Sequence, residues 1–193
     1  MKNVVIKRIL AFILDMFIVG FISSLIAYPF IDKSNNDKIY NNIISINNEY
    51  IDDNNIDYSS YFKEVSGLYY QISKTNSIEV FFNIVISIIC FIVIPIYNNG
   101  SSLGMKVLGI KIKSKNKQLT SNQLVVRSLI NYYILLNILN ILFLIVINKD
   151  YYYLVIMIFN AIQMIIMIVS LMMIIFNKDK LGIHDKLTNT YVE

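Results

Sequence analysis

Residues 9–31 read ILAFILDMFIVGFISSLIAYPFI, an apolar run that holds one charged residue, Asp15. A helix rises about 1.5 Å per residue and needs roughly 20 apolar residues to cross a bilayer, so the run predicts a transmembrane helix. A carboxylate inside such a helix costs about 2.5–3.5 kcal/mol on insertion scales. Asp15 is therefore expected to have a partner or a function.

The basic residues Lys2, Lys7 and Arg8 precede this run, as they would in a signal peptide. The run is about twice the usual length of the apolar region of a signal peptide, and it contains Asp15. We interpret it as an uncleaved first transmembrane helix.

Three further apolar runs follow in the chain. With 56% hydrophobic residues and a mean hydropathy of +0.57, the chain is more apolar than a typical soluble domain. The pattern predicts an all-α integral membrane protein with one domain over residues 1–193. Its expected transmembrane helices are about 9–31, 80–97, 126–147 and 152–176, with an outer loop at 32–79 and an inner loop at 98–125.

Charged residues predict how the chain is oriented. The segment 98–127 carries six basic residues and no acid, whereas 32–79 carries eight acids and four lysines. Cytoplasmic loops are enriched in Lys and Arg, so both termini and the inner loop are expected in the cytoplasm. The expected location is the cell membrane, multi-pass. The orientation in the membrane is enough to explain these basic residues, so nucleic acid is not an expected partner.

The frequent Ile, Asn, Lys and Tyr are typical of an AT-rich genome and indicate a bacterial source.

The outer loop divides into two parts. Its first part is rich in Asn and Asp and is expected to be mobile. Residues 58–72 have aromatic and aliphatic residues at helical spacing, with Asp57 or Ser59 available as an N-cap. This pattern predicts an amphipathic helix, which either lies on the outer membrane surface or folds over the bundle as a lid.

The inner loop has its own pattern. Residues 107–113 begin to alternate apolar and basic side chains, which predicts a short strand, with a β-hairpin as one possible form, or an interfacial segment. Thr120 and Gln123 have the spacing of a capping box that would open the third helix.

Polar residues inside the third and fourth helices fall on common faces and should point into the bundle. They could form hydrogen bonds between helices or a polar path across the membrane. In the third helix they are Arg127, Asn131, Asn137 and Asn140, and in the fourth Asn160, Gln163, Ser170 and Asn177.

Sequence signatures of enzymes and metal sites are missing. The chain has one histidine, His184, and one cysteine, Cys90, so it has no zinc-binding motif and no histidine-based triad beside a hydroxyl in the membrane. We expect no enzymatic activity, no cofactor and no metal.

Three stretches of the chain resemble the RDD family of small bacterial membrane proteins. They are Lys7 to Asp15 (KRILAFILD), Ser102 to Ile112 (SLGMKVLGIKI) and Leu181 to Val192 (LGIHDKLTNTYV). The family is named for one arginine and two aspartates, which the resemblance assigns to Arg8, Asp15 and Asp185. Asn189 stands where the family usually has a small residue, and the outer loop has no counterpart. The resemblance implies a membrane protein involved in transport.

These residues lead to two functional hypotheses. Arg8, Asp15 and Asp185 are expected to form one charge cluster at the inner face, with Lys106, Arg127 or His184 as possible partners. In the first hypothesis the protein is a transporter or a proton/monovalent-cation exchanger that uses Asp15, although Asp15 could equally belong to a structural ion pair. In the alternative it is a non-transporting accessory, immunity or assembly protein. The expected partners are the lipid bilayer and a second copy of the chain or another membrane protein.

Overall fold

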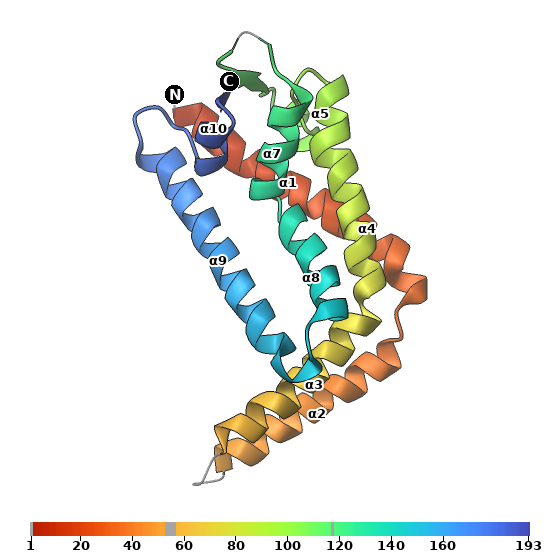
Figure 1. Ribbon diagram of the computed structural model, residues 1–193. Coiled ribbons are helices and arrows are strands. Elements are labelled where there is room, and N and C mark those ends of the chain that lie inside the picture. The colour runs from red at the N-terminus through yellow and green to blue at the C-terminus, as the bar shows by residue number, and fades with distance from the viewer. Residues whose placement is uncertain (1, 53–56, 117) are drawn as a thin grey trace.

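Helices make up most of the structure, a computed structural model that describes residues 2–52, 57–116 and 118–193 (Figure 1). Residues 53–56 of the expected outer loop and Lys117 of the inner loop lie outside the described residues. The elements are α1 (Lys2–Ala27), η1 (Tyr28–Phe30), α2 (Lys33–Asp52), α3 (Tyr58–Thr75), α4 (Ser77–Ile88), η2 (Ile89–Val93), α5 (Ile94–Tyr97), α6 (Leu103–Val107), β1 (Ile112–Ser114), α7 (Ser121–Asn131), α8 (Ile134–Val146), α9 (Lys149–Phe176), α10 (Ile183–Leu187) and β2 (Thr190–Val192).

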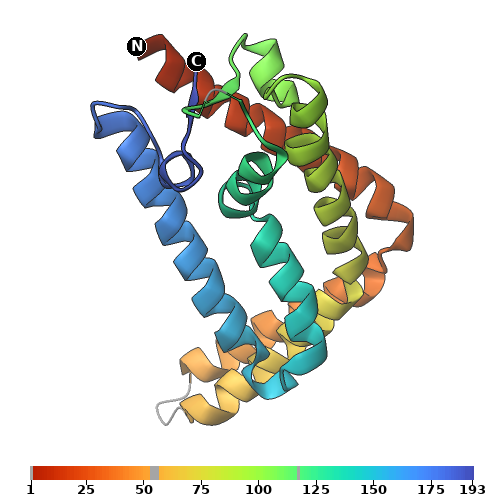
Figure 2. The same cartoon turned by 45° about the horizontal axis from the view of Figure 1, so that its top comes forward.

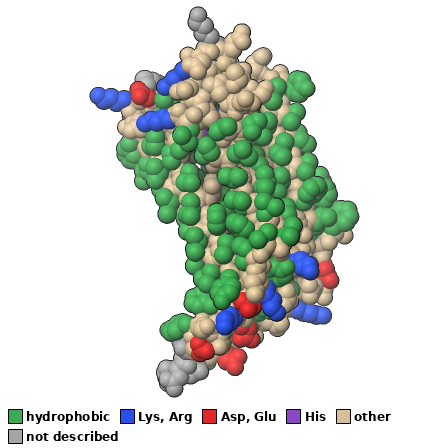
Figure 3. Space-filling model, viewed as in Figure 1, with side chains coloured by type: hydrophobic (Ala, Val, Ile, Leu, Met, Phe, Trp, Pro, Cys, Tyr) green, Lys and Arg blue, Asp and Glu red, His purple; other side chains and the backbone are tan. Residues whose placement is uncertain are grey.

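The long helices form a bundle with two different ends. Both chain termini, α6, α10 and the two strands lie at one end, which we call the terminal end (Figure 1). The helices α2 and α3 cross the opposite end, which we call the hairpin end. Apolar side chains cover the middle of the visible face, and charged side chains gather toward the two ends (Figure 3). This distribution suits a protein whose middle lies in the hydrocarbon layer.

Within the described residues, three helical segments are long and apolar enough to cross a membrane: Val4–Phe30, Ser77–Tyr97 and Lys149–Phe176. The pair α7 and α8 makes a fourth if it counts as one span, although its halves are bent by 65°. The structure therefore supports an all-α membrane protein with three or four spans.

The first span buries one narrow stripe of α1. Ala11, Asp15, Val19, Ser23 and Ala27 recur at every fourth position, and each is at most 1% exposed. Residues four apart lie on one face of a helix. Because most of these residues are small, α1 packs closely against α4 and α6. Apolar side chains on other faces of α1, such as Ile13, Phe17 and Phe21, are exposed.

The third span was expected to be one helix over 126–147, and this was wrong. The capping box at Thr120 and Gln123 is present as expected and starts α7 at Ser121. The helix then breaks at Tyr132 and Tyr133, and Tyr133 has a left-handed φ of 59°. The Tyr132 ring is buried and stacks on Phe91 with 3.6 Å between ring centroids. The break occurs at a tertiary contact, and the sequence there has no Gly or Pro from which it could be predicted.

The second span is continuous but contains one π turn, η2, between α4 and α5. A π turn leaves backbone carbonyls available for other donors. Here the Phe91 carbonyl accepts a hydrogen bond of 2.8 Å from the Ser128 hydroxyl of α7. The irregular points of two spans are thus bound to each other.

The first part of the outer loop, which was expected to be mobile, forms a helix, α2, over Lys33–Asp52. Its Ile39 and Ile43 are buried against Ile72 of α3. Packing of an apolar stripe stabilises a helix more than intrinsic propensity does, which explains how an Asn-rich segment becomes helical. The expected helix at 58–72 is present as α3, and Asp57 is its N-cap.

The helix α3 packs on the bundle. The Ser66 hydroxyl donates to the Lys149 carbonyl at 2.6 Å, and the Tyr69 ring stacks on Tyr153 of α9 with 4.4 Å between centroids. Of the two alternatives for this helix, these contacts favour the one in which it folds over the end of the bundle.

The inner loop contains a strand, β1, but its partner is not in that loop. It pairs antiparallel with β2 at the end of the chain, with Ile112 opposite Val192 and Ser114 opposite Thr190. The expected hairpin was therefore wrong, because the apolar residues of β1 pack against the C-terminal segment: Ile112, Val192 and Ala11 share one buried cluster. This pairing holds the C-terminal segment at the terminal end, and Figure 2 shows α10 lying between α9 and α7 there.

Candidate functional site

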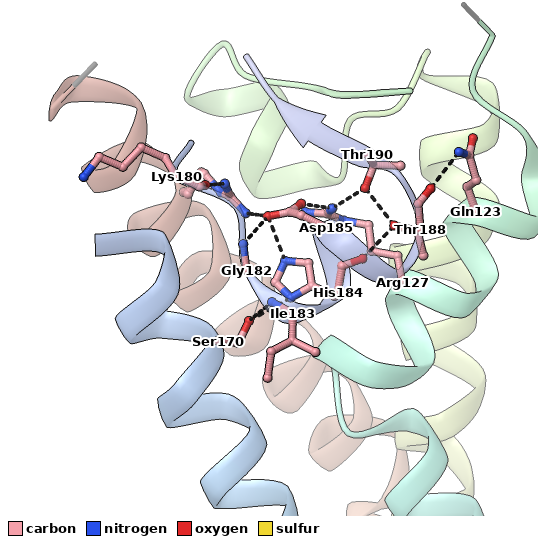
Figure 4. Close-up of polar contacts among 11 residues, drawn as sticks. Gln123, Arg127, Ser170, Lys180, Gly182, Ile183, His184, Asp185, Thr188 and Thr190 are labelled. Carbon is pink, nitrogen blue, oxygen red and sulfur yellow. Dashed lines mark hydrogen bonds and ion pairs between the residues drawn. The ribbon is translucent and has the colours of Figure 1, made fainter. Parts of the chain in front are cut away.

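Asp185 lies at the centre of a buried charge cluster at the terminal end. It is fully buried, and its two carboxylate oxygens accept from Arg8 of α1 and Arg127 of α7 (Figure 4). The other hydrogen bonds of the two arginines go to the Lys180 carbonyl at 2.7 Å and the Thr190 hydroxyl at 2.8 Å. The C-terminal segment is thereby linked to two membrane helices by charge-assisted hydrogen bonds.

The short helix α10 presents Asp185 to the arginines. The Gly182 N–H donates to Asp185 Oδ2 at 2.8 Å, which fixes the carboxylate at the start of α10. Ser170 of α9 accepts from the Ile183 N–H at 3.1 Å. A Cβ at Gly182 would lie 2.6 Å from the Ser170 hydroxyl oxygen, so only glycine permits this approach.

His184 belongs to the same cluster. Its Nδ1 lies 3.2 Å from the Ser170 hydroxyl, and its Nε2 lies 3.6 Å from Asp185 Oδ2. Burial and the nearby Arg127 lower the pKa of His184 to about 3, so the ring is neutral at physiological pH. Burial alone would raise the pKa of Asp185, but Arg127 and Arg8 outweigh it and hold that pKa well below its usual range.

Asp15 does not belong to this cluster, contrary to the expectation of a single site. It is 1% exposed, and its oxygens accept from the Ser102 hydroxyl at 2.5 Å and the Gly104 N–H at 2.6 Å. Across the described ranges, no ion pair involves Asp15. Side chains of a helix lean toward its N-terminus, so Arg8 extends away from Asp15, which lies about two turns further along α1.

Of the expected partners, Arg127 and His184 join the Asp185 cluster. Lys106 is exposed on α6, and no ion pair of Lys106 occurs in the part of the chain that the structure describes. Ser102 and Gly104 were not predicted as site residues, although both lie in the stretch 102–112 that carries the family resemblance.

The contact between α1 and α6 requires a glycine. A Cβ at Gly104 would lie 2.5 Å from the Ala11 carbonyl oxygen and 3.0 Å from Asp15 Oδ1. Without that Cβ, the backbone N–H of Gly104 reaches the carboxylate directly. Asp15 is thus held by neutral donors from the inner loop.

The surroundings of Asp15 contain further polar groups. Tyr132, at the break between α7 and α8, and Cys90, in the π turn, belong to one buried cluster of side chains, and Met16, the residue after Asp15, packs against it. Both irregular points of the membrane spans therefore lie near this residue.

A second polar group lies deeper along the same face of α1. Ser23 is eight residues, or about 12 Å, beyond Asp15. Its hydroxyl accepts from Asn83 of α4 at 3.3 Å, and Asn83 accepts from Asn137 of α8 at 2.9 Å. The interior of the bundle thus carries polar side chains at two depths.

The polar face expected on the fourth helix is partly realised. Ser170 is buried, and the Gln163 side chain donates to the Ile130 carbonyl at 3.1 Å. Asn160 is exposed, so its expected position inside the bundle was wrong. In the segments that the structure describes, no group of three or more His, Cys, Asp or Glu side chains could hold a metal ion.

The sequence model of the RDD family matches residues 4–189. The chain belongs to the RDD family. The match includes Arg8, Asp15 and Asp185, and it extends across 32–79, for which the resemblance offered no counterpart. No curated protein and no solved structure matches this RDD protein. The family membership and the apolar helices together indicate an integral membrane protein.

Proposed function

We propose that this RDD protein is a transporter of the cell membrane that binds a proton or a monovalent cation at Asp15. The observation that carries the proposal is the buried Asp15 carboxylate, which has hydrogen-bond donors but no ion pair in the described chain. A buried charge without a counter-charge is costly, so it is neutralised by a bound proton or cation. A group that can be neutralised in either way is the basic requirement for exchange.

Comparison with Asp185 supports this assignment. Asp185 contacts two guanidinium groups, which compensate its charge permanently. Asp15 contacts a hydroxyl and a backbone N–H, which stabilise a carboxylate but do not neutralise it. The two aspartates therefore have different roles: Asp185 is structural and Asp15 is the ion-binding group.

The irregular helices near Asp15 provide a second argument. Ion and substrate sites of membrane transporters often lie where membrane helices are interrupted, since interrupted helices expose backbone groups. Here Tyr132 at the break and Cys90 in the π turn share a buried cluster that packs against Met16, the neighbour of Asp15 in α1. The polar side chains of Ser23, Asn83 and Asn137 lie further along the bundle and extend the polar interior.

The distribution of basic residues supports one orientation. Lys106, Lys111, Lys113 and Lys115 lie in the loop of the terminal end, whereas α2 and α3 carry a mixture of acids and lysines. By the positive-inside rule, the terminal end faces the cytoplasm and the hairpin end faces outward. In this orientation Asp15 lies in the cytoplasmic half of the membrane.

Oligomerisation is part of this proposal. Three or four spans are few for a carrier, because transporters of the alternating-access type are commonly built from repeated sets of helices. A second copy of the chain would supply more helices, and apolar side chains exposed along α9, such as Ile158, Ile162 and Ile165, offer a surface for it.

The test measures ion exchange in inverted vesicles with a pH-sensitive dye. Addition of Na⁺ or K⁺ should release protons from vesicles that contain the wild-type protein. Asp15→Asn should abolish this response while its amount in the membrane stays unchanged. The matched control is Asp37→Asn, which removes an exposed carboxylate of α2 and should retain the response. A stable Asp15→Asn variant with wild-type exchange would contradict the proposal and would favour the accessory role.

A further inference from the structure

A cavity of about 190 Å³ lies between α1, α7 and α9 near the terminal end. Phe12, Met105, Met167 and Ile174 contribute its apolar walls, and Arg8, Arg127 and His184 line its polar part. It is larger than the apolar protein cavity of about 150 Å³ that holds a benzene molecule. A segment of an acyl chain fits such a space, but a whole lipid does not.

The side chains at the edge of the cavity face the membrane. Ile168 and Leu171 of α9 line it, yet they are 46% and 40% exposed. Since α9 is a candidate membrane span, these exposed side chains lie where lipid surrounds the protein. The cavity is therefore accessible from the bilayer, and a ligand can leave most of its hydrocarbon in the membrane.

The polar part of the cavity carries an excess of positive charge. Arg8 and Arg127 contribute two positive charges and Asp185 one negative charge, while His184 is neutral. In addition, the buried Nε of Arg127 lacks a hydrogen-bond partner within the described structure. A buried guanidinium that is incompletely compensated favours a nearby anion.

We infer that this cavity binds an anionic phospholipid. Its phosphate lies toward Arg8 and Arg127, and one acyl chain enters between α1 and α9. The charge excess argues for the anionic group, and the apolar walls with their opening to the membrane argue for the lipid chain. The inference concerns residues other than Asp15 and is independent of the ion-exchange proposal.

The experiment uses the absence of tryptophan from the chain. Ile168→Trp places one fluorophore at the mouth of the cavity, and Val169→Trp is the matched control. Val169 is the next residue at nearly the same depth, is 44% exposed and does not line the cavity. Each variant is reconstituted in phosphatidylcholine vesicles that contain the same fraction of brominated phosphatidylglycerol or brominated phosphatidylcholine, and tryptophan quenching is measured.

The expected result is preferential quenching at the cavity. Ile168→Trp should report a local enrichment of phosphatidylglycerol over phosphatidylcholine of about fivefold, the effect of one basic side chain on an anionic lipid. Val169→Trp should show no such preference. Leu171→Phe, added to Ile168→Trp, narrows the mouth of the cavity without changing the charges and should weaken the preference.

Three results would overturn the inference. Equal quenching by the two lipids at Ile168→Trp would show that no anionic lipid is selected. A preference of unchanged size in Leu171→Phe would show that the lipid binds outside the cavity. A third set of vesicles contains brominated oleate. Selective quenching by this fatty acid, with none by brominated phosphatidylglycerol, would identify a free fatty acid as the occupant instead.

Discussion

Asp15 and Asp185 have identical side chains in different surroundings. Both are buried, but Asp185 is compensated by Arg8 and Arg127, whereas Asp15 receives hydrogen bonds from neutral donors. A fully paired carboxylate fixes structure, and a carboxylate without a counter-charge can exchange a proton for a cation. The two residues should therefore respond differently to the same substitution.

For Asp185→Asn we predict a large loss of stability. The change leaves Arg8 and Arg127 buried without their common anion, and breaking a buried pair costs about 3–5 kcal/mol. The thermal unfolding midpoint in detergent should fall well below that of the wild type. Asp179→Asn, which changes an exposed carboxylate in the same segment, is the control and should leave the midpoint unchanged. An unaltered midpoint for Asp185→Asn would show that the cluster does not stabilise the fold.

Because His184 is buried, we predict that the folded protein loses stability in mild acid. Its pKa is lowered from 6.5 to about 3 by burial and Arg127, so between these values the unfolded chain binds a proton that the folded protein does not. Stability should therefore decrease as the pH falls below 6.5, by up to about 1.4 kcal/mol per pH unit. The measurement is the unfolding midpoint at about pH 7.5 and about pH 5. His184→Gln should reduce the difference between the two, and a wild-type difference in this variant would rule out His184 as its source.

At the scale of elements, α6 depends on its close approach to α1. Gly104→Ala would bring a Cβ to 2.5 Å from the Ala11 carbonyl oxygen, so the two elements must separate. Such overpacking typically costs about 1–3 kcal/mol. We expect a lower unfolding midpoint and weaker ion exchange, because the Gly104 N–H would move away from Asp15. Gly67→Ala, where the new Cβ meets no atom within 4 Å, is the matched control.

Local sequence patterns predicted the elements that local interactions determine. The apolar runs predicted α1, α4 and α9, and Thr120 and Gln123 predicted the start of α7. Asp57 and Ser59 were the two candidates for the N-cap of α3, and Asp57 is the N-cap. The break at Tyr132 and the pairing of Ile112 with Val192 depend on residues far away in the chain. Such long-range contacts cannot be predicted from the local periodicity of the sequence.

The candidate site was predictable in part for the same reason. The cost of burying charge identified Asp15 as a residue that needs a partner, and the resemblance to the RDD family added Arg8 and Asp185. Which charges meet depends on tertiary structure: β2 and α10 return to the terminal end and bring Asp185 between Arg8 and Arg127. Asp15 instead accepts hydrogen bonds from Ser102 and Gly104. These groups are neutral, and nothing in the local sequence predicts that they bind Asp15.

At the scale of the whole molecule, the charge distribution predicts the orientation in the membrane. The native Cys90 is buried and is first replaced by alanine. Ser34→Cys on α2 should then react with a membrane-impermeant maleimide in intact cells, because the proposed orientation places the hairpin end outside. Lys115→Cys at the terminal end should react after the cells are opened and not before. Labelling of Lys115→Cys in intact cells would reverse the proposed orientation.

Asp15 is proposed to bind a proton that a cation can replace. Difference infrared spectroscopy of the reconstituted protein measures this directly through the C=O stretching band of a protonated carboxyl group. Wild-type protein should show such a band that disappears when Na⁺ or K⁺ is added at constant pH, and Asp15→Asn should lack that change. If the cation-dependent change persists in Asp15→Asn, or if no carboxyl band of the wild type responds to either cation, Asp15 is not the exchange site.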